Sequence, residues 1–130
     1  MVNKKQIIVL GAGGFIGSYL VKRLKQENVY VKGIDIKLPD FSKSAADEFI
    51  VGDLRDINFV RSIIDEQTDE LYQLAGDVGG AGYIFTGDND ANVMTNSIQI
   101  NVNLLKEQSL LNKNLGLNKT KIFYSSSACI

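Results

Sequence analysis

The chain has 130 residues, of which 45% are hydrophobic and 22% charged, and its formal net charge is −1 at pH 7. This length and composition predict one globular domain, and the balance of 14 basic and 15 acidic residues gives no basis for nucleic acid or an anionic membrane as a partner. Because the chain has no histidine and one cysteine, a Ser-His-Asp triad, a Cys/His zinc site and an internal disulfide are excluded within these residues, and no metal site is predicted.

The sequence also carries no recognisable targeting segment. Residues 1–6 pass directly into a short apolar strand, which is not the pattern of a signal peptide, and no apolar run is long enough for a membrane span. The single cysteine, Cys129, is compatible with a reducing compartment, so a cytoplasmic location is expected.

Strand-like and helical patterns alternate along the chain. Strands are predicted at 6–10, 29–34, 48–51, 70–74 and 121–125, and helices at 14–27, 56–66 and 88–112, with loops at 37–47 and 75–82. The alternation predicts a Rossmann-type, doubly wound parallel α/β sheet, and right-handed crossovers give the strand order 3-2-1-4-5. Ligands of such sheets bind at the carboxyl ends of the strands.

A glycine-rich turn joins the first strand to the first helix. Gly11 and Gly13 fit the start of the common dinucleotide fingerprint, but Ile16 stands where its third glycine belongs; the spacing that fits is Gly11-x-x-Gly14-x-x-Gly17. Such glycines let the backbone approach a pyrophosphate at the helix N-terminus, or they merely allow tight packing of a βα turn. The predicted cofactor contacts here are Gly11, Gly14, Phe15, Ile16 and Gly17.

Asp35 ends the second strand, 18 residues after Gly17. A carboxylate at this place can bind the hydroxyls of an adenosine ribose and repels a 2′-phosphate, so NAD is predicted over NADP. Lys37 could soften that preference, or it is a solvated loop lysine.

Polar or small residues end the third and fourth strands as well. Asp53 either bonds the adenine edge, with Leu54 packed nearby, or is a turn or N-cap aspartate before the following helix. The small residues in Leu74-Ala75-Gly76 allow the chain to pass beneath a cofactor, or they form a plain strand-to-loop junction.

Taken together, these motifs resemble the extended short-chain dehydrogenase/reductase family, and within it the NAD-dependent epimerases and dehydratases of nucleotide sugars. The loop Gly79-Gly80-Ala-Gly82 and the sequence Ser-Ser-Ala-Cys-Ile at 126–130 are similar to those of its GDP-mannose 3,5-epimerase group. A departure is Gly76, where the family usually has alanine. The resemblance implies that a GDP-mannose-like nucleotide sugar is the substrate and that the protein forms a homodimer through a helix like that at 88–112.

The same resemblance implies roles for individual residues. Ser127 would be the catalytic serine and Cys129 the acid/base next to a ketone, while each has a structural alternative as a strand-end serine or a buried thiol. Asn101 would orient the cofactor, or it lies on a solvated helical face as Asn89, Asn92, Asn96 and Asn103 are expected to do. Asp53, Leu54 and Ser125 would complete the cofactor contacts, and Gly79, Gly80, Ser127, Ala128 and Cys129 would contact the substrate.

The tyrosine that the family's hydride chemistry requires, with a lysine four residues later, is missing from these 130 residues. Residues 1–130 are therefore expected to be the NAD-binding domain of a larger enzyme, incomplete before its sugar-binding domain and inactive alone. The alternatives are a non-catalytic NAD-binding sensor or partner module, and a dehydratase or reductase acting on another nucleotide sugar.

Overall fold

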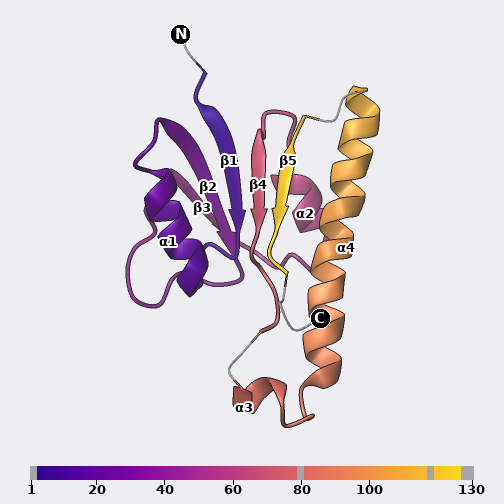
Figure 1. Ribbon diagram of the computed structural model, residues 1–130. Helices are drawn as coiled ribbons and strands as arrows, with labels where there is room; N and C mark the ends of the chain where they lie inside the picture. Colours follow the sequence, from indigo (N-terminus) through magenta and orange to yellow (C-terminus); the bar gives the residue numbers. More distant parts are fainter. Residues whose placement is uncertain (1–2, 79–80, 117–118, 127–130) are drawn as a thin grey trace.

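The fold is a parallel sheet with helices on both faces. The computed structural model describes residues 3–78, 81–116 and 119–126. Its strands are β1 (Lys5–Leu10), β2 (Val29–Asp35), β3 (Glu48–Val51), β4 (Glu70–Gln73) and β5 (Lys121–Tyr124), and its helices are α1 (Phe15–Leu24), α2 (Ile57–Ile63), α3 (Ala81–Ile84) and α4 (Asp90–Leu115). All pairings are parallel and the order is β3-β2-β1-β4-β5, which confirms the predicted Rossmann-type sheet (Figure 1).

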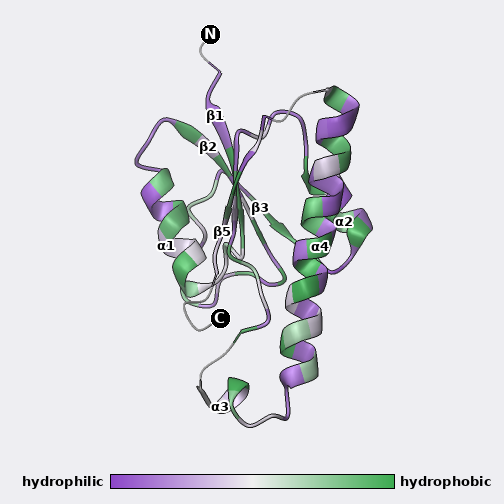
Figure 2. Cartoon of the chain, turned by 45° about the vertical axis from the view of Figure 1, so that its right-hand side comes forward, coloured by the Kyte–Doolittle hydropathy of each residue, from purple (hydrophilic) through white to green (hydrophobic). Residues whose placement is uncertain are grey.

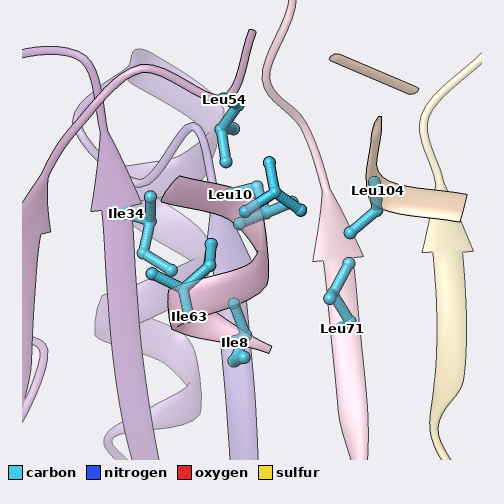
Figure 3. Close-up of a cluster of buried hydrophobic side chains, with 8 residues drawn as sticks. Ile8, Leu10, Ile34, Leu54, Ile63, Leu71 and Leu104 are labelled. Atoms are coloured by element: carbon cyan, nitrogen blue, oxygen red, sulfur yellow. The ribbon is translucent and has the colours of Figure 1, made fainter. Parts of the chain in front are cut away.

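Successive residues of β1 supply the cores on both faces of the sheet. Ile7 and Val9 pack in one cluster with residues of α1, whereas Ile8 and Leu10 pack in the other with residues of α2 and α4. This follows from the two-residue repeat of a strand, and it explains why β1 is apolar throughout its buried length. Figure 3 shows the second cluster, in which Ile8, Leu10, Ile34, Leu54, Ile63, Leu71 and Leu104 point toward one another.

The helices differ from their predicted bounds at their ends, and the helix predicted at 14–27 spans Phe15–Leu24. The helix predicted at 56–66 ends at Ile63, because Asp65 accepts hydrogen bonds from the Gln67 N–H and the Thr68 hydroxyl and so forms a turn. The helix predicted to end at 112 continues to Leu115 and stops at Gly116, whose φ of 65° suits a left-handed cap. In the described part of the chain, no helix combines the length and apolarity needed to cross a membrane.

The short helix α3 begins inside the predicted loop 75–82 and ends two residues beyond it. It lies beyond the carboxyl ends of the strands in Figures 1 and 2. The Asn89 side chain donates to the Tyr83 carbonyl at 3.2 Å and the Tyr83 hydroxyl donates to Asp77 at 3.0 Å. These longer-range bonds stabilise a helical turn that its glycine would disfavour locally.

At the opposite edge of the sheet, where the strands begin, Asp69 links β1, β4 and β5. Its carboxylate accepts the Gln6 N–H at 2.8 Å and lies 3.3 Å from the Lys119 ammonium, and its backbone bonds both Gln6 and Lys121. The hydrogen bond from Gln6, and then Lys119, hold the pKa of Asp69 below its ordinary value. The ionised form therefore supports the junction of β1, β4 and β5.

Asp69→Asn is expected to reduce the acid sensitivity of the fold. Because the folded pKa is lowered, the contribution of Asp69 is complete above its ordinary pKa of about 4 and is lost as the pH falls through the folded value. The difference in melting temperature between wild type and variant should therefore be largest near neutral pH and shrink below about pH 4. Thermal unfolding from pH 7 to pH 2.5 measures it, with Asp88→Asn at an exposed aspartate as the control; a pH-independent difference would contradict the assignment.

Candidate cofactor-binding site

A cleft of about 860 Å³ opens at the carboxyl ends of the strands. It is lined by the turn before α1, the segments that follow β2, β3 and β4, and one side of the first turns of α4. These segments meet because all the strands run in the same direction, so their carboxyl ends share one edge of the sheet.

Close backbone approach shapes the glycine turn at the floor of this cleft. Gly11 has a φ of 80°, and a Cβ there would lie 2.9 Å from the Ala75 nitrogen. A Cβ on Gly17 would lie 2.0 Å from the Gly11 carbonyl oxygen, so this position accepts only glycine. A Cβ on Gly13 would lie 3.1 Å from an Asp35 carboxylate oxygen. Gly17 therefore serves packing, whereas Gly11 and Gly14 line the cleft.

The N-terminus of α1 faces the same space. Gly14 is its N-cap and provides no side-chain cap, and the first hydrogen bond of the helix runs from the Ser18 N–H to the Gly14 carbonyl at 2.9 Å. The N–H groups from Phe15 to Gly17 precede this first bond and so have no partner within the helix, and the helix dipole favours an anion at this end.

Asp35 stands where the turn meets β2. Its Oδ2 accepts the Gly13 N–H at 2.9 Å, which fixes the carboxylate beside the glycine turn and leaves acceptor capacity toward the cleft that it lines. Lys37 pairs with Asp40 at 2.6 Å and its side chain is 63% exposed, in agreement with a solvated loop lysine.

Asp53 is held by its neighbour Arg55. Its carboxylate accepts the Arg55 N–H at 2.9 Å and the guanidinium through Nε at 3.0 Å and Nη2 at 2.7 Å. The Arg55 guanidinium is the main cause that holds the pKa of Asp53 below its ordinary value. Asp53 is not the N-cap of α2, because Asp56 holds that position and accepts the Asn58 N–H at 2.8 Å. Asp53 does form the turn before the helix, since its carbonyl accepts the Asp56 N–H at 3.0 Å and its carboxylate accepts the Arg55 N–H.

A buried glutamine, Gln73, holds the backbone of the segment that follows β4. Gln73 is 2% exposed; its Nε2 donates to the Ala75 carbonyl at 2.9 Å and to Asn101 Oδ1 at 2.8 Å, and its Oε1 accepts the Ala75 N–H at 3.2 Å. The Gln73 side chain therefore satisfies both the N–H and the carbonyl of Ala75, which lies past the end of β4 where hydrogen bonds between strands do not reach. Asn101 therefore acts beneath the cleft and does not line it.

The structure brings most of the predicted cofactor residues together. Those that line the cleft are Gly11, Gly14, Phe15, Asp35, Asp53, Leu54, Leu74, Ala75 and Gly76. Four do not line it: Ile16 is exposed, Gly17 is buried, Asn101 bonds Gln73, and Ser125 is an exposed residue whose N–H donates to the Gln73 carbonyl. The predicted substrate and catalytic residues Gly79, Gly80, Ser127, Ala128 and Cys129 lie outside the described residues.

Several cleft residues escaped the sequence analysis. Tyr19 and Lys22 follow Phe15 at helical spacing and line the cleft from α1, so the helical period could have found them. Asn96 lines it from α4, and Asn103 is 2% exposed and donates to the carbonyls of Leu54 and Arg55. The expectation that Asn96 and Asn103 are polar surface is wrong, because their partners come from the segments after β3 and β4, which only the fold places beside α4.

Comparison with known proteins assigns the chain to a family. The model of the NAD dependent epimerase/dehydratase family matches residues 7–130. The chain belongs to this family. The prediction of NAD as cofactor is therefore confirmed at the level of the epimerase/dehydratase family, which is NAD dependent.

Curated relatives of the epimerase/dehydratase chain include plant enzymes. GDP-mannose 3,5-epimerase 1 of Oryza sativa subsp. indica is 35% identical over 98% of this chain, and GDP-mannose 3,5-epimerase of Arabidopsis thaliana is 36% identical over 96% of it. The matches cover 32% and 31% of those relatives, so the chain spans about a third of their length.

Solved structures share the fold. A UDP-glucose 4-epimerase from Brucella ovis in complex with NAD gives a TM-score of 0.78 at 19% identity, over 95% of this chain and 36% of that one. Uronate dehydrogenase from Agrobacterium tumefaciens, a Y136A mutant complexed with NAD, gives 0.70 at 20% identity, over 96% of this chain and 42% of that one. These likenesses concern the Rossmann-type sheet and its flanking helices.

Proposed function

We propose that this chain is the NAD-binding portion of a nucleotide-sugar epimerase of the GDP-mannose 3,5-epimerase type. The observation that carries the proposal is the cleft in which a glycine turn, the free N-terminus of α1 and the Asp35 carboxylate face one space. Gly11, Gly13 and Gly14 line that cleft with bare backbone, so the residues present fit a dinucleotide. The identities of 35% and 36% to plant GDP-mannose 3,5-epimerases support the choice of sugar nucleotide.

Each part of the cleft has a place in this proposal. The N–H groups at the start of α1 bind the pyrophosphate, Asp35 accepts from the adenosine ribose, and Asp53 with Leu54 lies against the adenine. NAD, when bound, supplies hydride transfer. Ser127 and Cys129 keep their proposed roles at the sugar, where a thiol with an ordinary pKa of about 8.5 is suited to proton transfer once a cleft lowers that value.

Titration with NAD tests the cofactor part of the proposal. Isothermal calorimetry on this chain should give saturable binding of NAD and clearly weaker binding of NADP, because the 2′-phosphate would meet Asp35. Equal binding of both, or no binding of either, would contradict it. A second experiment tests the proposed epimerase activity. We propose that epimerisation needs residues beyond these 130, so the full-length protein is incubated with GDP-mannose and the product stereoisomers are separated. A dehydrated product would favour the dehydratase alternative, and a reduced product the reductase alternative.

These residues lack a Tyr-x-x-x-Lys pair, so a non-catalytic NAD-binding module is the alternative function. A non-catalytic NAD-binding module would bind NAD as above but leave GDP-mannose unchanged in the full-length protein as well. The two measurements therefore separate the rivals. A reducing, cytoplasmic location remains part of the proposal and rests on the single cysteine.

We further propose that the protein forms a homodimer through α4. Met94, Ile98, Val102 and Leu105 recur at helical spacing on this helix and are all more than half exposed. Figure 2 shows green hydrophobic bands among the hydrophilic ones along α4. A second copy of the helix would remove this apolar stripe from water.

Ile98→Glu is expected to weaken such a dimer. A charge at the middle of the stripe would be desolvated in the interface, so the dissociation constant should rise by at least about tenfold. Sedimentation velocity over a concentration series measures it, with Asn92→Glu, at an exposed position of the same helix, as the control. A monomeric wild type would contradict the proposed dimer.

A further inference from the structure

A chain of polar side chains runs from the cofactor cleft to α3. Arg55, held by Asp53, donates from Nη1 to Asn96 Oδ1 at 3.1 Å. Asn96 Nδ2 in turn donates to Asp77 Oδ2 at 2.8 Å. Asp77 Oδ1 then accepts the Tyr83 hydroxyl at 3.0 Å. The members of this polar chain are therefore Asp53, Arg55, Asn96, Asp77 and Tyr83.

The partners of Asn96 fix which way its amide points. A guanidinium can only donate and an ionised carboxylate can only accept, so Arg55 must face the amide oxygen and Asp77 the amide nitrogen. Both bonds involve a charged partner, which makes them stronger than bonds between neutral groups. Asn96 thus bridges a cation and an anion that approach from different loops, the one after β3 and the one after β4.

Asp77 is the member that reaches α3. Its N–H donates to Ser97 Oγ at 3.1 Å, so both its backbone and its side chain are held by α4, and its other carboxylate oxygen holds Tyr83. Asp53, Arg55, Asn96 and Asp77 all line the cleft. A ligand in the cleft would exclude water from their hydrogen bonds and strengthen them.

We propose that Asn96 is a positioning residue that holds Asp77 at the cofactor cleft and, through the Tyr83 hydroxyl on Asp77, fixes α3, so that filling the cleft makes α3 more ordered. The part that concerns NAD rests on the function proposed above; the positioning of α3 does not. The consequence is that cofactor binding prepares the segment that follows β4.

Asn96→Asp is the sharpest test, because it keeps the side-chain shape. The new carboxylate still accepts from Arg55 but repels Asp77, to which it can no longer donate. The double variant N96D/D77N restores a donor opposite an acceptor and returns the net charge to that of wild type, while the amide oxygen at position 77 can still accept from Tyr83. Asn92→Asp, exposed on the same helix, adds the same charge outside the polar chain.

Hydrogen exchange of the amides at 81–84, measured by mass spectrometry with and without NAD, reads the result. Without ligand, Asn96→Asp should exchange about tenfold faster than wild type there, and N96D/D77N should recover most of the protection, while Asn92→Asp changes nothing. NAD should slow exchange at 81–84 in wild type and in the double variant but not in Asn96→Asp.

Two results would overturn the inference: unchanged exchange in ligand-free Asn96→Asp, or no recovery in the double variant. Binding of NAD without slower exchange at 81–84 in wild type would overturn the ordering by cofactor while leaving the proposed function intact. Failure of NAD to bind at all would instead remove the proposed function, and the ligand-free comparison would still decide whether Asn96 positions α3.

Discussion

Gly17→Ala is expected to destabilise the fold by about 3 kcal/mol, at the upper end of the usual range for overpacking. The new methyl carbon would lie 2.0 Å from the Gly11 carbonyl oxygen and 2.8 Å from the Gly11 carbonyl carbon. Both neighbours are backbone atoms of the turn that carries the cleft floor, so neither can rotate aside. Either α1 moves away from the sheet or the turn distorts, and each change also removes the geometry proposed for NAD.

Urea unfolding gives the free energy of unfolding of this variant, and calorimetry gives its NAD affinity. Gly14→Ala is the matched control, since its new methyl would meet its nearest neighbour, the Gly11 carbonyl oxygen, at 3.4 Å. As an N-cap it should lose about 1 kcal/mol or less. Because the fold of Gly14→Ala is nearly intact, a change in its NAD affinity measures how far the added methyl group hinders the approach of NAD to the turn. A wild-type free energy of unfolding for Gly17→Ala would refute the packing role of this glycine.

Asp35→Ala is expected to weaken NAD binding by about 10- to 100-fold, the size of one or two hydrogen bonds to a charged group. The variant removes the proposed acceptor of the ribose hydroxyls and also the acceptor of the Gly13 N–H, which lies 2.9 Å from Asp35 Oδ2. Because the repulsion of a 2′-phosphate disappears with the carboxylate, NADP should lose less affinity than NAD. The preference for NAD over NADP should therefore narrow.

Calorimetric titration with both dinucleotides measures this change. Asp40→Ala removes a carboxylate from the same cleft without touching the glycine turn, and its partner there is Lys37. This control should retain NAD affinity, and the freed lysine should favour NADP. Equal NAD affinities for Asp35→Ala and wild type would show that the carboxylate does not bind the ribose and would undermine the proposed cofactor site.

The sequence alone was sufficient to predict the sheet and its strand order, and nine of the residues that it proposed for the cofactor line one cleft. The reason is that these depend on local signals. Apolar runs bounded by glycines and acids locate the strands, and Asp35 follows its strand directly, so parallel pairing carries it to the edge where Gly11 also lies. The Gly11, Gly14 and Gly17 spacing predicted a turn that the structure contains, and membership of the NAD dependent epimerase/dehydratase family agrees with it.

Only the tertiary structure decided the roles of the polar residues on α4 and at the end of β4. Asn96 and Asn103 look alike in the sequence, yet one bridges Arg55 and Asp77 whereas the other is buried and holds carbonyls after β3. Gln73 gives no sequence signal for its clamp on Ala75 and Asn101. A polar side chain takes its role from the partner that the fold places opposite it, and those partners lie up to 49 positions away in the sequence.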